Sequence, residues 1–191
     1  MKNICVFCGS SNDLAEEYYK VAEELAELIV QKGYGIMHGA GIIGLMGRLI
    51  KGAAKHGGKV TGVVPESLNK SFIVNDVKQV LVVTKDMKDR KEYLRENSCA
   101  FIALPGGFGT LEEVAEVITL KQLKYHAKPI IFMNTLGYYD KLFDFFDEMF
   151  EQKFALPDYR KTYKVVRTPQ EAITFIENYT FENIYDKYLQ K

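Results

Sequence analysis

The chain has 191 residues, about the length of one domain, and its 25 Lys and Arg residues balance 25 Asp and Glu residues. Apolar residues make up 47% of the sequence, which is typical of a globular protein with a buried core. The zero net charge argues against binding of nucleic acid, because such surfaces need many uncompensated Lys and Arg side chains. No apolar run approaches the roughly 20 residues of a membrane span, and the N-terminal pattern is not that of a signal peptide. We expect a cytoplasmic protein with a single domain over residues 1–191, bound to neither nucleic acid nor membrane.

Strand and helix patterns alternate along the chain. Continuous apolar runs predict strands at residues 4–8, 34–38, 60–64, 77–83, 101–104 and 130–133. Helical spacing predicts helices at residues 45–56, 86–96, 111–123 and 140–150, a first helix capped by Asp13 and ended by Gly33, and a last helix opened by the capping box Thr168 to Glu171. This order predicts an α/β fold, a Rossmann-like, doubly wound parallel sheet with helices on both faces. Such sheets bind ligands at the carboxyl ends of their strands.

Cys5 and Cys8 form a C-x-x-C pattern inside the first predicted strand. Residues three apart in a strand point to opposite faces, roughly 10 Å apart, which is too far for a disulfide. No second C-x-x-C completes a zinc site, and the histidines, His38, His56 and His126, are scattered along the chain. We therefore expect buried structural cysteines, no metal and no cofactor.

A glycine-rich loop, Gly39-Ala40-Gly41-Ile42-Ile43-Gly44, joins the second strand to a helix. Its G-x-G-x-x-G spacing is that of a loop that brings backbone amides close to a phosphate, with a helix N-terminus behind it. Glu66 lies near the position where a dinucleotide site would hold the ribose. The alternative is a tight turn that lets the helix pack closely on the strand. Both interpretations remain open from the residues alone.

A second loop, Pro105-Gly106-Gly107-Phe108-Gly109-Thr110, follows the fifth predicted strand directly. Three glycines in four positions free the backbone to turn several N–H groups toward an anion. The alternative is purely structural, because Thr110 and Glu113 have the spacing of a capping box. Capping leaves the glycine density unexplained, so we expect a ligand on this loop with Glu113 in reach of it.

Arg90 and Lys91 are adjacent on the helix predicted at residues 86–96. Their apolar stems could pack beside Met87 and Leu94 while the charged heads reach water. Beside two phosphate-friendly loops, the pair fits better as a clamp for an anion or a carboxylate.

Together these motifs resemble the LONELY GUY (LOG) family, many of whose members were long labelled lysine decarboxylases. The resemblance covers about residues 2–150 and rests on Pro105 to Glu113, Arg90-Lys91, Gly44-Leu45-Met46-Gly47, Val6 to Ser11, Lys128-Pro129 to Asn134 and Gly137-Tyr138-Tyr139. Where the family usually reads Tyr-Gly-Gly-Gly before Gly-Leu-Met-Gly, this chain reads His38-Gly39-Ala40-Gly41.

The resemblance implies a homodimeric nucleoside 5′-monophosphate phosphoribohydrolase. Such an enzyme hydrolyses the N-glycosidic bond of AMP or of cytokinin ribotides to free base and ribose 5-phosphate, without a cofactor. The family's catalytic pair falls on Arg90 and Glu113. The implied substrate-binding residues are Gly9, Ser10, Gly41, Gly44, Met46, Lys91, Gly106, Gly107, Phe108, Gly109, Thr110, Leu111, Glu112 and Thr119.

The chemistry of this pair is physically sensible. Departure of a purine builds positive charge on the ribose, as in glycosidases, and the Glu113 carboxylate would stabilise that charge or activate water. A neighbouring cation lowers the pKa of a carboxyl group, so we expect Arg90 to keep Glu113 ionised and oriented. A phosphate held on the second glycine loop would position the ribose.

Two other functions compete with hydrolysis. A non-catalytic nucleotide sensor could use the same loops and would bind without turnover. An NAD-dependent oxidoreductase would use the first glycine loop with Glu66, but it leaves the second loop unexplained. A pyridoxal-dependent decarboxylase has no support, because no Lys is marked as a Schiff-base partner.

Residues 138–150 carry more aromatic side chains than one buried stripe needs. This excess predicts a subunit interface on the stripe Tyr138, Tyr139, Phe143, Phe145, Phe146 and Phe150.

Overall fold

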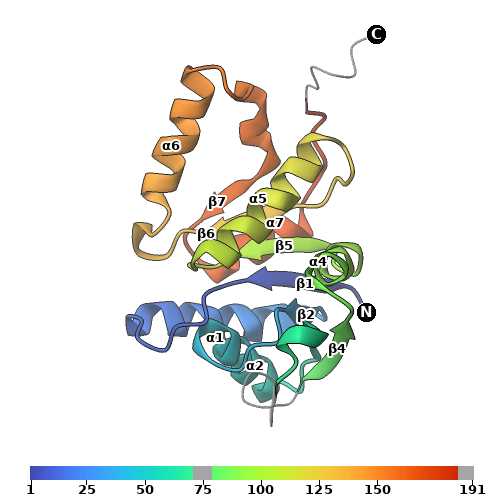
Figure 1. The fold of residues 1–191 in the computed structure, drawn as a ribbon. Helices are drawn as coiled ribbons and strands as arrows, with labels where there is room; N and C mark the ends of the chain where they lie inside the picture. The colour runs from blue at the N-terminus through green and yellow to red at the C-terminus, as the bar shows by residue number, and fades with distance from the viewer. Residues whose placement is uncertain (71–78, 185–191) are drawn as a thin grey trace.

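The computed structural model describes residues 1–70 and 79–184 and contains one all-parallel, seven-stranded sheet (Figure 1). The strand order is β4-β3-β2-β1-β5-β6-β7. The strands are β1 (Asn3–Phe7), β2 (Gly35–His38), β3 (Val60–Pro65), β4 (Val80–Thr84), β5 (Ala100–Ala103), β6 (Ile130–Met133) and β7 (Lys164–Val166). The chain therefore builds outward from β1 to β4, returns to place β5 beside β1, and builds outward again to β7. This order confirms the doubly wound, Rossmann-like prediction.

Helices cover both faces of the sheet because successive side chains of each buried strand point in opposite directions. Ile4 and Val6 pack against one face, covered by α1 (Glu16–Gln31), α2 (Gly44–Lys55) and α7 (Pro169–Glu177). Cys5 and Phe7 pack against the other face, covered by α4 (Met87–Glu96), α5 (Phe108–Gln122) and α6 (Asp140–Glu151). Short 3-10 helices complete the described chain: η1 (Glu66–Leu68), η2 (Thr135–Gly137) and η3 (Pro157–Thr162). In the described ranges no helix is both long and apolar enough to cross a membrane.

Some predicted elements differ from the structure. Helix α1 begins at Glu16 after an extended Ala15, so Asp13 is not its cap; the Asp13 amide instead donates to the Ser11 hydroxyl in a local turn. The strand predicted at residues 77–83 is β4 from Val80, and residues 77 and 78 lie outside the described part of the chain. Strand β7 was not predicted, since two of its three residues are exposed and it carries little apolar signal.

The last helix begins as the sequence predicts. The Glu171 amide donates to the Thr168 hydroxyl at 3.3 Å, and Pro169 occupies the first helical turn. The Glu171 carboxylate accepts from the Arg167 amide at 2.9 Å, one residue before the cap. All three cysteines are free; Cys5 is buried as predicted, whereas Cys8 and Cys99 are only partly buried.

The two halves of the sheet meet at β1 and β5, whose following loops touch. The Gly9 amide donates to the Pro105 carbonyl at 3.0 Å, and the Leu104 amide donates to the Phe7 carbonyl at 2.9 Å. The chain runs from β1 to α1 on one face of the sheet and from β5 to α5 on the other face. In doubly wound folds the crevice at such a switch point is the usual ligand site.

Candidate active site

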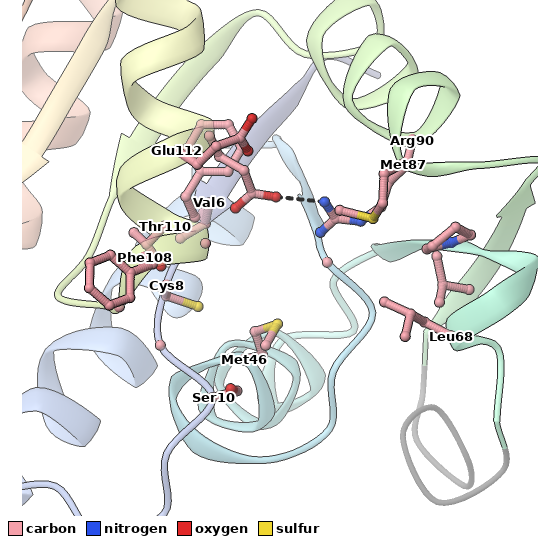
Figure 2. Close-up of a pocket in the computed structure, with 18 residues that line it drawn as sticks. Val6, Cys8, Ser10, Met46, Leu68, Met87, Arg90, Phe108, Thr110 and Glu112 are labelled. Atoms are coloured by element: carbon pink, nitrogen blue, oxygen red, sulfur yellow. Dashed lines mark hydrogen bonds and ion pairs between the residues drawn. The ribbon is translucent and has the colours of Figure 1, made fainter.

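A cavity of about 520 Å³ opens at the switch point (Figure 2). This volume lies within the range of small-molecule sites. The walls come from the ends of β1 and β3, the loops after β1, β2 and β5, and the first turns of α2, α4 and α5, with η1 at the rim. The lining residues are Val6, Phe7, Cys8, Gly9, Ser10, Gly39, Met46, Val64, Pro65, Leu68, Met87, Arg90, Gly107, Phe108, Gly109, Thr110, Glu112 and Glu113.

An ion pair between Arg90 and Glu113 forms the charged wall of the cavity. The Arg90 Nη1 atom donates to Glu113 Oε1 at 2.7 Å (Figure 2). Arg90 Nε donates to the Val63 carbonyl at 3.0 Å. Only 8% of Arg90 is exposed. Charge-assisted hydrogen bonds in such a dry setting are short and directional, so the guanidinium fixes the orientation of the carboxylate.

Burial raises the pKa of the Glu113 carboxyl above its ordinary value. The charge and hydrogen bond of Arg90 offset part of this rise without reversing it. Arg90 lowers this pKa as expected, but desolvation of the Glu113 carboxylate outweighs that effect. A carboxylate with a raised pKa is a better proton acceptor than an exposed one.

The second glycine loop places the N-terminus of α5 at the cavity. Helix α5 begins at Phe108 with Gly107 as its N-cap, not at residue 111 as predicted. Thr110 is thus inside the first turn, and Glu113 bonds Arg90, so the capping-box interpretation of these two residues is wrong. The amides of residues 107 to 110 belong to the first turn, where a helix leaves its N–H groups without helical partners. Together with the helix dipole, these groups favour an anion.

Two tyrosines form hydrogen bonds to backbone carbonyls at the start of this loop. The Tyr138 hydroxyl donates to the Gly106 carbonyl at 2.7 Å, and the Tyr139 hydroxyl donates to the Leu104 carbonyl at 2.7 Å. Both bonds engage carbonyl oxygens and leave the amides of the first turn of α5 for a ligand. A side chain at Gly106 would meet Thr110 and would lie 2.9 Å from the Gly9 amide, so only glycine fits there.

The first glycine loop is a tight turn, and the protein itself bonds two amides at its end. The Gly44 amide donates to the Asn12 side chain at 2.9 Å, and the Leu45 amide donates to the Gly9 carbonyl at 3.1 Å. The N-terminal amides of α2 are therefore partly occupied by the protein itself. Glu66 is exposed in η1 and does not line the cavity. This geometry disfavours a dinucleotide bound on the first loop.

Most of the predicted site residues lie together at the cavity, and six do not line it. Lys91 forms ion pairs with Glu112 and Glu116, the latter at 3.1 Å, so it clamps carboxylates of α5. Thr119 is exposed and donates to the Ala115 carbonyl, six residues beyond Glu113 and so about 9 Å farther along α5. The other four residues that do not line the cavity are Gly41, Gly44, Gly106 and Leu111.

Sequence reasoning missed the apolar part of the cavity. The polar part holds Arg90, Glu113 and the first turn of α5, whereas the missed residues line the remaining walls: Val6, Phe7, Cys8, Gly39, Val64, Pro65, Leu68 and Met87. Figure 2 shows Leu68 and Phe108 at opposite ends of the cavity. Val64 and Pro65 could have been predicted as lining residues. They stand at the carboxyl end of the strand predicted at residues 60–64, and all strands of a parallel sheet end at the edge where ligands bind.

The aromatic stripe is used mainly in the core. Tyr139 and Phe150 are buried, and Phe143 and Phe146 pack around Phe132. Among the aromatic residues of the stripe that lie on α6, Phe145 is exposed, with 57% of its surface accessible to solvent.

The family model described as "Possible lysine decarboxylase" matches residues 46–176 of this chain. A protein of Arabidopsis thaliana named "Cytokinin riboside 5'-monophosphate phosphoribohydrolase LOG7" is 38% identical over 189 residues, which cover 97% of this chain and 87% of that protein. A second protein of Arabidopsis thaliana, named "Cytokinin riboside 5'-monophosphate phosphoribohydrolase LOG5", is 37% identical over 178 residues, which cover 93% of this chain and 78% of that protein. The chain belongs to the LOG family. The description of the family model names a lysine decarboxylase, but within residues 1–70 and 79–184 no Lys lines this cavity.

Solved structures share the fold of this LOG-family chain. The molybdenum cofactor binding protein from the phototrophic bacterium Rippkaea orientalis aligns with a TM-score of 0.71 at 23% identity, over 93% of this chain and 96% of that chain. The molybdenum cofactor carrier protein from Chlamydomonas reinhardtii aligns with a TM-score of 0.67 at 25% identity, over 93% and 97%. One fold thus serves proteins named as carriers and proteins named as hydrolases, and the site must distinguish them.

Proposed function

We propose that this LOG-family chain is a nucleoside 5′-monophosphate phosphoribohydrolase that acts on AMP or on cytokinin ribotides. It cleaves the N-glycosidic bond and releases the free base and ribose 5-phosphate. The observation that carries the proposal is that the buried Arg90–Glu113 pair and the N-terminus of α5 open into one cavity. The names of the plant relatives support the same reaction.

The cavity fits the three parts of such a substrate. The 5′-phosphate binds the amides of the first turn of α5, where the helix dipole favours negative charge. Glu113 then faces the ribose, three residues further along the same helix. The base occupies the apolar part of the cavity beside Met46, Leu68 and Met87.

Hydrolysis needs only water as a second reactant. The bond between C1′ and the base nitrogen breaks, and positive charge develops on C1′ and the ring oxygen. The Glu113 carboxylate stabilises this charge and accepts the proton of the water whose oxygen bonds to C1′. The departing base takes up a proton from the medium. Arg90 orients Glu113, and the phosphate on α5 holds C1′ in reach.

A non-catalytic nucleotide-binding protein is the second candidate. The likeness to molybdenum cofactor carriers favours it, because those proteins share this fold. A binding protein would retain nucleotide in the cavity and release no base, so turnover decides between the two functions.

The oligomeric state and the location of the protein are part of the proposal. A homodimer is supported by the LOG resemblance and by exposed Phe145 and Phe154, which line a surface groove beside α6. Sedimentation at micromolar concentration that gives only a 21.8 kDa species would contradict it. A cytoplasmic location is supported by the three free cysteines, which suit a reducing compartment.

The test of the function is base release. Purified protein is incubated with AMP and, separately, with its N6-isopentenyl derivative, and free base is followed by chromatography. We expect release by the wild type, loss of at least a hundredfold in Glu113→Gln, and wild-type rates in Glu116→Gln. Glu116 is a matched control because it lies one turn further along α5 and pairs with Lys91 and Arg95 outside the cavity. Nucleotide binding without release from either substrate would establish the binding protein instead.

A further inference from the structure

A buried histidine at the end of β2 bonds the residue that precedes β4. His38 is 0% exposed, and its Nε2 atom lies 3.0 Å from the Oε1 atom of Gln79. Burial lowers the pKa of His38 to about 4, so the ring is neutral at neutral pH. Because Gln79 Oε1 can only accept, the Nε2 atom of the neutral ring carries the proton. The amide of Gln79 then points its Nε2 atom at the Ala40 carbonyl, 3.1 Å away.

The residue that receives this second bond has a strained backbone. Ala40 has a φ of +67°, in the left-handed region that L-residues other than Asn and Asp rarely adopt. Such conformations persist only where the surroundings hold them. The Gln79 amide supplies such a restraint on Ala40, and His38 in turn fixes the Gln79 side chain.

The strained turn forms a wall for Arg90. A Cβ atom at Gly39 would overlap Arg90 Nη2, so the guanidinium lies directly against the backbone at this position. The same guanidinium donates to the Val63 carbonyl and to Glu113. Arg90 is thus bounded by β3, by α5 and by the turn that Gln79 holds.

We infer that His38 and Gln79 are positioning residues, which hold the Gly39–Ala40 turn and thereby keep the Arg90 guanidinium on Glu113. Neither side chain lines the cavity, so neither touches the substrate. Loss of the Gln79 bond lets Ala40 relax to a negative φ and moves the peptide at Gly39. Arg90 then gains room to leave Glu113. The kinetic part of this inference rests on the proposed hydrolase function, whereas the geometric part does not.

The kinetic experiment compares Gln79→Met with Gln31→Met. Methionine keeps the length of the side chain and removes both hydrogen bonds. Gln31 is a matched control, because its amide also lies beside a histidine, His56 at 3.4 Å, on the surface between α1 and α2. We expect kcat for AMP to fall tenfold or more in Gln79→Met with KM within about twofold of wild type, and no change in Gln31→Met. If Gln79 had only a structural role, Gln79→Met would lower the fraction of active enzyme, and the pH dependence of kcat in the remaining active enzyme would not change.

The second readout needs no turnover. The pKa of the Glu113 carboxyl is measured by ¹³C NMR in the protein without nucleotide. The groups that face Glu113 are Arg90 and Lys91 of α4, Glu112 of α5, and the thiols of Cys5 in β1 and of Cys8 directly after it. Because Arg90 lowers this pKa, its displacement in Gln79→Met should raise the value further above that of the wild type.

The outcomes separate the two proposals. An unchanged Glu113 pKa and an unchanged kcat in folded Gln79→Met overturn the positioning role. If Gln79→Met does not fold, as judged by near-UV circular dichroism, His38→Phe takes its place, because it removes only the bond between the two side chains. A wild-type protein that releases no base overturns the hydrolase, and the NMR measurement then still decides the role of Gln79.

Discussion

Arg90 and Glu113 are 23 residues apart in the chain, yet Nη1 of one lies 2.7 Å from Oε1 of the other. The contact exists because both helices pack on the same face of the sheet, α4 against β3 and β4 and α5 against β1 and β5. Val63 of β3 holds the other edge of the guanidinium through its carbonyl. The charged wall of the cavity therefore depends on three elements that only the folded sheet brings together.

The first prediction concerns the pH dependence of base release. Glu113 acts as a carboxylate, so activity is lost as pH falls through its pKa in the free enzyme. Burial raises this pKa above its ordinary value, and we expect the acid limb of kcat/KM to lie at higher pH than that of an exposed Glu. The measurement is kcat/KM for AMP between pH 4 and 9. An acid limb at or below about 4.3, the ordinary value for Glu, would exclude Glu113 as the group that titrates.

The second prediction concerns the shape of the guanidinium. Arg90 bonds Glu113 and Val63 from different nitrogens of one planar group, which a Lys ammonium cannot reproduce. We expect Arg90→Lys to lower kcat/KM for AMP about a hundredfold, the usual cost of a misplaced electrostatic group in an active site. Arg95→Lys is the control, because Arg95 lies on the same helix and pairs only loosely with Glu116 at 3.8 Å. Equal rates in the two variants would show that charge alone suffices at position 90.

The third prediction concerns the support of the α5 loop. Tyr138→Phe removes the hydroxyl that donates to the Gly106 carbonyl and leaves the ring in place. A hydrogen bond of this kind contributes about 1 kcal/mol, so we expect AMP to bind about fivefold more weakly. Calorimetric titration of the Glu113→Gln background measures binding without turnover. Tyr125→Phe serves as the control, since Tyr125 is an exposed residue of the turn after α5. A similar loss in both variants would mean that the hydroxyl of Tyr138 does not support the loop.

Six of the seven strands along the chain and the positions of the two glycine loops were predictable, because both depend on local signals. Buried parallel strands read as continuous apolar runs, and the β5–α5 loop combines three glycines with a following helix. The role of the first loop was not predictable, because it depends on Asn12 and on the Gly9 carbonyl, which only the fold brings to α2. Glycine spacing alone does not distinguish an amide that is free for a phosphate from one already bonded.

Side-chain partners across the sheet were the least accessible to sequence reasoning. Thr110 and Glu113 have the spacing of a capping box, and only the position of Arg90 shows that Glu113 bonds elsewhere. In the same way Tyr138 and Tyr139 lie in an aromatic stripe that predicts an interface, but their hydroxyls reach the β5–α5 loop. In both places the local pattern does not reveal the distant partner that the side chain reaches, and the predicted interface remains untested.

The last prediction concerns a buried lysine outside the cavity. Lys121 is 1% exposed, its ammonium lies 5.0 Å from the ring centroid of Tyr179, and within the described residues it forms no ion pair. Burial lowers its pKa from 10.5 to about 8. Between these values the unfolded chain holds a proton that the folded chain has released, so the free energy of unfolding rises with pH in this window.

The free energy of unfolding rises by about 1.4 kcal/mol per pH unit for one such group, which amounts to roughly 3 kcal/mol between pH 8 and 10.5. Lys121→Met removes the titrating group, so the wild type should gain this much relative to the variant over the same window. Urea unfolding of both proteins at a series of pH values measures the difference directly. Lys20→Met, at an exposed position of α1, should show the same pH dependence of the free energy of unfolding as the wild type. If Lys121→Met also tracks the wild type, the ammonium of Lys121 keeps its ordinary pKa in the folded protein.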